Sequence, residues 1–243
     1  MRPPRTLRPC AASASRFAVA SVLPCVLALA PAPACAAEDA TGPLPPRLED
    51  RVFDVFLDDR EVGGHRYHFE GDPSDFRLES RAEFAVKIAF VTVFSYDHEA
   101  DEHWVDGCLV TLASETEARR EFTVDARRTS DGFSVDTGDG GQTYAWACPW
   151  SFAYWNPALR ERARLVNPQD GKVFDLSFEA LEPAPLTIGE RSVRTRRWAM
   201  TGEKLDVTLY YDEQDRWLGL DSVVEGGRVL RYRPDPSDPF YPR

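Results

Sequence analysis

The sequence predicts an all-β protein, an antiparallel meander that forms a barrel or a strongly curved half-barrel with at most one or two short helices. Three observations support this prediction: apolar and polar residues alternate in several segments, turn dipeptides separate these segments, and helical spacing is scarce. With 243 residues, 43% of them hydrophobic and 12% aromatic, the chain can bury a sizeable core. These values exclude a wholly disordered chain.

The clearest strand is predicted over residues 75–88. Its even positions, from Phe76 to Ile88, are apolar or small, whereas its odd positions are almost all charged. This period of two is typical of an antiparallel strand with one face against the core and the other in water. The same period recurs over residues 122–126, 174–180 and 205–211, which favours a meander of about a dozen strands. One short helix is predicted over residues 158–164.

Glycine-containing dipeptides mark the predicted hairpins. Asp106-Gly107 predicts a two-residue turn, because both positions of such a turn need a positive φ. Asp131-Gly132 predicts a second hairpin of the same type. Gly226-Gly227 predicts a third, in which Glu225 and Arg228 form a cross-strand pair of opposite charge.

Residues 1–37 have the three-part layout of a secretory signal peptide. Four arginines without an acid precede an Ala-rich apolar stretch, and a small-residue exit follows at residues 34–37. The apolar stretch is too short to span a bilayer comfortably, although a membrane anchor or a disordered N-terminus is the alternative. We therefore expect export, to the periplasm or as a secreted protein. A lipid anchor on Cys35 is not expected, because no large aliphatic residue stands three positions before it.

The remaining chain is divided into three parts. Residues 38–50 and residues 234–243 are rich in proline and are predicted to be an extended leader and a Pro-rich tail. Residues 51–233 are predicted to be a single β domain, because no break in composition marks a linker. No later run is apolar enough to be a stable membrane span.

The acidity of the chain limits its partners. Losing the four arginines of the signal peptide from a net charge of −11 leaves −15. Nucleic acid is excluded as a partner, because phosphate binding needs clustered Lys and Arg. Anionic membrane surfaces are disfavoured for the same reason. The acidic strand faces would instead suit a basic protein of the cell envelope as a partner.

Two cysteines, Cys108 and Cys148, lie outside the predicted signal peptide. In an oxidising compartment this even pair predicts one disulfide, with two buried free thiols as the alternative.

Motifs of common enzymes are absent, and the sequence predicts neither a cofactor nor a metal site. There is no Gly-x-Ser-x-Gly turn and no phosphate-binding loop. His65 and His68 have opposite parity in one strand, as have His98 and His103 in another, so neither pair converges on a metal ion.

His65 shares parity with apolar neighbours in its predicted strand. It is interpreted either as a core histidine or as a polar anchor inside an apolar ligand cavity. A second candidate lining is the apolar run over residues 84–94, which includes Phe84, Val86 and Phe90. Burial on both faces explains this run, and so does an exposed apolar entrance.

An aromatic cluster follows Cys148 directly. Trp150, Tyr154 and Trp155 belong to it, and Asn156 ends it. One interpretation is a core plug that closes one end of the sheet. The other is a lining or lid for an apolar ligand, with Tyr154 and Asn156 as hydrogen-bonding groups.

Four separated motifs resemble those of exported bacterial proteins that are catalogued only as a domain of unknown function. They are residues 55–65, 104–108, 152–157 and 224–228, and the resemblance covers residues 51–233. It implies no established activity, so no catalytic residue is transferred. The meander is also similar, at the level of the fold, to the half-barrels of periplasmic lipoprotein carriers.

The leading hypothesis is an exported, non-enzymatic β protein that binds an apolar or lipid-like small molecule. One alternative is an enzyme acting on a lipid or another envelope compound, with His65 or His98 as acid–base groups. The other is an assembly factor that contacts an envelope protein through its acidic faces.

Overall fold

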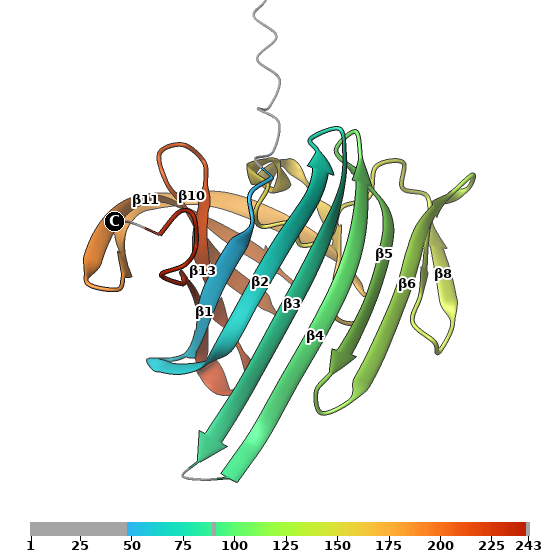
Figure 1. Cartoon of the computed structure of the whole chain (residues 1–243). Coiled ribbons are helices and arrows are strands. Elements are labelled where there is room, and N and C mark those ends of the chain that lie inside the picture. The colour runs from blue at the N-terminus through green and yellow to red at the C-terminus, as the bar shows by residue number, and fades with distance from the viewer. Residues whose placement is uncertain (1–47, 89–90, 242–243) are drawn as a thin grey trace, which may run out of the picture. The chain divides into compact units, whose positions relative to one another are not determined.

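A computed structural model describes residues 48–88 and 91–241, which belong to one compact unit of the chain. Predictions for residues 1–47, including the signal peptide, most of the leader and Cys35, lie outside the described residues. The described residues form fourteen strands and two 3-10 helices (Figure 1). The strands are β1 (Arg51–Leu57), β2 (Arg60–Asp72), β3 (Asp75–Ile88), β4 (Val91–Val105), β5 (Cys108–Glu117), β6 (Glu121–Thr129), β7 (Gly132–Asp136), β8 (Gly141–Tyr144), β9 (Arg164–Val166), β10 (Val173–Ile188), β11 (Arg191–Gly202), β12 (Leu205–Tyr211), β13 (Trp217–Val223) and β14 (Val229–Pro234).

All fourteen strands form one antiparallel sheet in which strands adjacent along the chain pair with each other, except β8 and β9. The order is β8-β7-β6-β5-β4-β3-β2-β1-β14-β13-β12-β11-β10-β9, so the pairing of β1 with β14 joins the two halves of the meander. The sheet curves strongly, with β1–β6 facing the viewer of Figure 1 and β10–β13 lying behind them. Strands β8 and β9 are its edges and do not pair. The predicted all-β fold is confirmed in its half-barrel form.

Both helices are short. η1 (Pro157–Glu161) begins after Asn156, whose side-chain oxygen accepts a hydrogen bond from the backbone N–H of Ala158 at 3.1 Å. η2 (Glu225–Gly227) lies in the loop before β14. In the part of the chain that the structure describes, no helix is long and apolar enough to cross a membrane.

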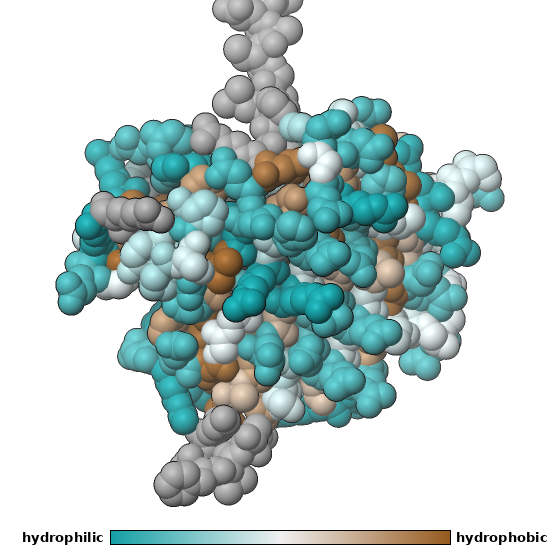
Figure 2. Space-filling model, viewed as in Figure 1, coloured by the Kyte–Doolittle hydropathy of each residue, from teal (hydrophilic) through white to brown (hydrophobic). Residues whose placement is uncertain are grey.

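Strand β3 has the bounds that the alternation predicts, residues 75–88. Its even residues from Phe76 to Phe84 are buried, and its odd residues from Arg77 to Glu83 are exposed. The same alternation on neighbouring strands places the core on the concave face of the sheet. Figure 2 shows the outer face of β1–β6, which is largely covered by hydrophilic side chains.

One predicted hairpin is confirmed and two differ in register. Asp106 and Gly107 have φ values of 49° and 72° and connect β4 to β5, as predicted. Gly132 is not a turn residue, because it pairs with Thr129 inside the β6–β7 ladder. The third turn is longer than predicted: the backbone N–H of Val224, not Glu225, bonds to the carbonyl of Arg228 at 2.8 Å. The predicted Glu225–Arg228 pair is thus wrong for the register.

The Pro-rich C-terminal segment is docked onto the domain. Asp238 is fully buried and accepts a hydrogen bond from Arg51 Nε at 3.0 Å and one from the backbone N–H of Val52 at 2.8 Å. The Arg51 guanidinium also lies 4.6 Å from the ring centre of Phe240. Two turns, closed by backbone bonds from Asp238 to Asp235 and from Tyr241 to Asp238, replace the extended conformation that the prolines predict.

Candidate functional site

Two buried histidines lie in one row across the concave face. His65 on β2 is opposite Ala82 on β3, and Ala82 is opposite His98 on β4. His65 is 8% exposed and His98 is 4% exposed. Ala82, the residue between them, is also buried, at 3% exposed.

His65 makes hydrogen bonds with three uncharged side chains. Its Nε2 lies 2.7 Å from Ser80 Oγ, and its Nδ1 lies 3.2 Å from the hydroxyl of Tyr232 and 3.3 Å from that of Tyr67. Burial, assisted by His98, lowers the pKa of His65 to about 3. Burial also raises the pKa values of Tyr67 and Tyr232. The group is therefore a neutral polar network at neutral pH.

His98 connects the sheet to the turn that covers it. Its Nδ1 lies 2.8 Å from Thr116 Oγ1, which donates to the backbone carbonyl of Gln169 at 3.0 Å. A neighbouring hydroxyl, that of Ser114, donates to the carbonyl of Pro168. Burial lowers the pKa of His98 to about 4, so this imidazole is also neutral near pH 7.

Glu102 is a buried carboxyl on the same face of β4, 5% exposed. One of its oxygens accepts hydrogen bonds from Trp104 Nε1 at 2.7 Å and from Ser151 Oγ at 3.0 Å. Burial raises the pKa of Glu102 to about 7, against the opposing effect of these two bonds. Its carboxyl is therefore partly protonated near neutral pH.

Residues 149–155, which we name the plug segment, close one end of the half-barrel. Trp155 packs edge-on against Phe69, Phe76 and Trp104, with ring centres 5.1, 5.5 and 5.7 Å apart. Trp150 is 2% exposed and also packs edge-on against Trp104. Backbone bonds from Leu109 to Pro149 and from Val166 to Trp150 hold the segment at both strands that flank it.

The predicted disulfide is present. Cys108, the first residue of β5, is bonded to Cys148, directly before the plug segment, across 40 residues of sequence. The bond ties this segment to the Asp106-Gly107 turn, where β4 and β5 meet.

A cavity of about 270 Å³ lies between two walls of the curved sheet. Strands β2–β4 form one wall, with His65, His98 and Glu102, and strands β12–β14 form the other, with Leu205, Val207 and Leu220 among its apolar residues. The plug segment and residues 167–169 cover the space between the walls.

The structure brings three of the predicted ligand-binding residues to this cavity: His65, Tyr154 and Trp155. Phe84 lies two residues beyond Ala82 on the same face and stacks on Tyr96 with ring centres 5.1 Å apart. Of the predicted residues, Phe84, Val86 and Trp150 lie outside the lining, Asn156 caps η1, and Phe90 lies outside the described residues.

Several polar residues of the lining were not predicted from the sequence. Ser80 is the one hydroxyl residue on the apolar face of residues 75–88, and this exception could have identified it as a polar residue of the core. Glu102 shares parity with Trp104, which could have placed the carboxyl on the buried face. No local sequence pattern could have identified Tyr232, because it reaches His65 only through the pairing of β1 with β14.

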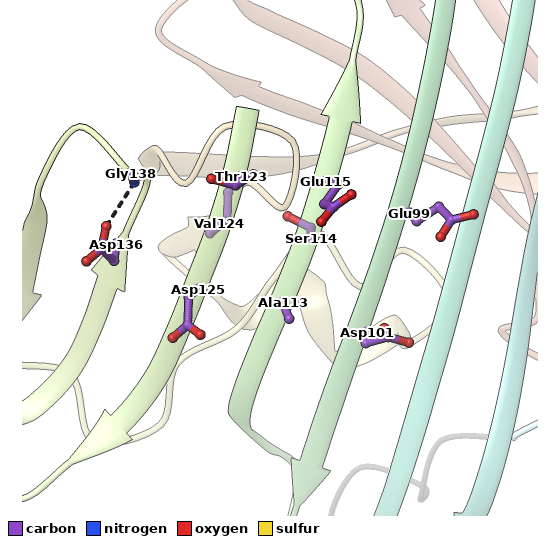
Figure 3. A pocket seen from close by; sticks show the side chains of 10 residues that line it. All are labelled: Glu99, Asp101, Ala113, Ser114, Glu115, Thr123, Val124, Asp125, Asp136 and Gly138. Carbon is purple, nitrogen blue, oxygen red and sulfur yellow. Dashed lines mark hydrogen bonds between the residues drawn. The ribbon is translucent and has the colours of Figure 1, made fainter. Parts of the chain in front are cut away.

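A second hollow, of about 460 Å³, lies on the outer face of β4–β7 and is strongly acidic (Figure 3). Glu99 is directly opposite Glu115, and Asp125 is opposite Asp136, so like charges face each other across the ladders. Arg81 offsets one of them through its ion pair with Glu99 at 3.2 Å. Among the described residues, no three His, Cys, Asp or Glu side chains are grouped to hold a metal ion.

Comparison with protein families gives a match over residues 53–235 to a family described as a domain of unknown function, DUF6134. The chain belongs to this family. The match spans most of the chain and agrees with the resemblance found from the four sequence motifs. The family description assigns no activity, so the function has to be argued from the site.

A solved structure with a similar fold is the beta-barrel-like protein of the domain of unknown function DUF1849 from Brucella abortus. The TM-score is 0.55 at 13% sequence identity, and the alignment covers 78% of this chain and 97% of that one. At this identity the similarity shows the fold alone. Comparison with curated proteins found no match.

Proposed function

We propose that this protein is an exported, non-enzymatic binding protein that holds an apolar or lipid-like small molecule inside its half-barrel. The observation that supports this best is the cavity of about 270 Å³ between β2–β4 and β12–β14. Apolar walls with a few convergent polar groups are typical of small-molecule sites, and apolar area supplies most of the affinity.

The proposal includes a periplasmic location. The signal-peptide pattern of residues 1–37 and the Cys108–Cys148 disulfide support it, because disulfides persist in oxidising compartments. Edman sequencing or intact-mass analysis of protein from the periplasmic fraction tests it, and we expect a chain that lacks about the first 37 residues.

Two measurements on the purified mature protein test the binding function. Organic extraction followed by mass spectrometry should release a small apolar molecule. The neutral fluorescent probe N-phenyl-1-naphthylamine should bind with increased fluorescence, because its naphthyl ring leaves water. Protein that is empty on extraction and does not bind the probe would contradict the proposal.

A matched pair of variants locates the site. Val207 is buried in the cavity wall, whereas Val223 on the next strand is 48% exposed. Val207→Phe should fill the cavity and abolish probe binding, and Val223→Phe should leave it unchanged. Circular dichroism of both variants confirms that they fold. Equal binding by the two variants would place the ligand elsewhere.

A second candidate function is an enzyme, and the 2.7 Å contact between Ser80 Oγ and His65 Nε2 favours it. A serine needs a base to become a nucleophile. Burial lowers the pKa of His65 to about 3, which makes this histidine a weak base. Its Nδ1 contacts two tyrosine hydroxyls, whereas a catalytic triad has a carboxylate at this position. We therefore prefer binding. A fluorophosphonate probe should leave Ser80 unlabelled, and labelling that Ser80→Ala abolishes would favour the enzyme.

A further inference from the structure

The cavity wall offers many hydrogen-bonding groups but no cation. None of its described lining residues is a lysine or an arginine, and Glu102 is the acidic one among them. Three of its polar residues, His65, His98 and Ser80, make hydrogen bonds to uncharged side chains.

Two arginines that lie close in sequence to lining residues are paired outside the cavity. Leu230, a lining residue, is flanked by Arg231, which pairs with Asp59 at 3.0 Å. Arg228 pairs with Asp58 at 2.8 Å on the same outer side of the β1–β2 turn. These guanidinium groups do not provide a counter-charge for a group bound inside the cavity.

An anionic head group would therefore be buried without an opposite charge. Burying an unpaired carboxylate or phosphate costs far more than burying a hydroxyl that keeps its hydrogen bonds. The carboxyl of Glu102 adds repulsion of like charge. We infer, resting on the proposed binding function, that the cavity selects single-chain amphiphiles with an uncharged polar group, such as a hydroxyl or an ester, and excludes carboxylates and phosphates.

The volume supports the single chain. Small-molecule sites usually range from about 300 to 1,000 Å³, and this cavity, at about 270 Å³, lies just below that range. One medium-length chain fits such a space, whereas a lipid with two or more chains does not.

Three ligands with matched chains test the inference. Decanol, methyl decanoate and decanoate compete with N-phenyl-1-naphthylamine for the mature protein at about pH 7.5, where the decanoate carboxyl is ionised. We expect the alcohol and the ester to compete at least about tenfold more strongly than decanoate. Equal or stronger competition by decanoate would overturn the selectivity while the binding function stands. If neither the probe nor any of the three ligands binds, both proposals fail.

A charge introduced into the wall provides a second test. Ser222 lines the cavity and is half-buried, so a lysine there can reach it, whereas Ser192 is exposed on β11. Ser222→Lys should raise the affinity for decanoate relative to that for decanol about tenfold. Ser192→Lys should leave this ratio unchanged. An unchanged ratio in a folded Ser222→Lys protein would contradict the role of charge.

Discussion

Ser151 Oγ donates a hydrogen bond to Glu102 Oε2 at 3.0 Å, which joins the plug segment to the concave face of the sheet. Both side chains are buried, and the same carboxylate oxygen also accepts from Trp104 Nε1 at 2.7 Å. The Glu102 carboxyl is therefore hydrogen-bonded to the plug segment and shielded from water. Its protonation is coupled to the stability of the end of the half-barrel that the plug segment closes.

Glu102→Gln should change how stability depends on pH. Burial raises the folded-state pKa of Glu102 to about 7 from an ordinary 4.5, so the stabilisation by this group is complete below pH 4.5 and is lost as pH rises through 7. Between about pH 5 and pH 8, the wild type should lose roughly 3 kcal/mol of unfolding free energy relative to the glutamine variant. Urea denaturation at both pH values measures this, and parallel profiles would contradict it.

His98→Asn should have the opposite dependence. Burial lowers the folded-state pKa of His98 to about 4 from 6.5, so the stabilisation is complete above pH 6.5 and is lost as pH falls through 4. Relative to the variant, the wild type should lose roughly 3 kcal/mol of unfolding free energy between about pH 7 and pH 4. The exposed His68, substituted by Asn, is the control: its hydrogen bond to Asp50 raises its pKa, so its effect should be small, because solvent screens the pair, and of opposite sign. Equal slopes for wild type and His98→Asn would refute the assignment.

Local sequence patterns predicted the strands. The features that these patterns did not predict depend on pairing between segments that are far apart in the chain. The prediction for residues 75–88 agrees with β3 because the alternation of apolar and polar residues lies within the segment itself. The prediction for Asp106-Gly107 agrees with the observed turn because a positive φ favours these two residue types. The Gly226-Gly227 register differed: the N–H of Val224 closes the turn onto Arg228, whose guanidinium pairs with Asp58, 170 residues away.

The candidate site shows the same division. His65 and Trp155 could be singled out because each is unusual among its immediate neighbours. Tyr232 and Val207 could not, because they face His65 only after β14 has paired with β1 and the sheet has curved. A sequence pattern of period two gives the face of a residue but not the strand that lies opposite.

Removing the disulfide should weaken both the domain and its closed end. The bond between Cys108 and Cys148 spans 40 residues, and a loop of this length is worth roughly 4 kcal/mol in the chain-entropy account. Cys108→Ser combined with Cys148→Ser should lower the unfolding free energy by roughly 2–4 kcal/mol. Urea denaturation of the two proteins in the same buffer measures the difference. Hydrogen exchange should rise first at the amides of residues 150–155, and unchanged exchange there would contradict the role of the bond in fixing the plug segment.

The C-terminal segment should be required for the stability of β1. Asp238 is fully buried against Arg51, and losing one member of a buried ion pair leaves the other charge uncompensated. We expect Asp238→Ala to cost roughly 3–5 kcal/mol of unfolding free energy. Asp235→Ala, in the same segment but next to solvent, is the matched control with a cost below about 1 kcal/mol. Similar costs for the two variants would contradict the prediction.

Gly219 should be the glycine that tolerates substitution least in the wall formed by β12–β14. Its φ is 140°, and a Cβ there would lie 2.2 Å from the carbonyl oxygen of Tyr232, so β13 and β14 could not keep their spacing. Gly226 in η2 is the matched control, because its φ of 81° is also positive but its Cβ would meet nothing within 4 Å. Gly226→Ala should lower the unfolding free energy by about 1 kcal/mol through backbone strain alone, and Gly219→Ala should lower it by more than about 3 kcal/mol.

Because Leu220 and Tyr232 both line the cavity, Gly219→Ala should also weaken binding of N-phenyl-1-naphthylamine. Equal losses of unfolding free energy in the two variants would show that the close approach of β13 to β14 does not limit this position.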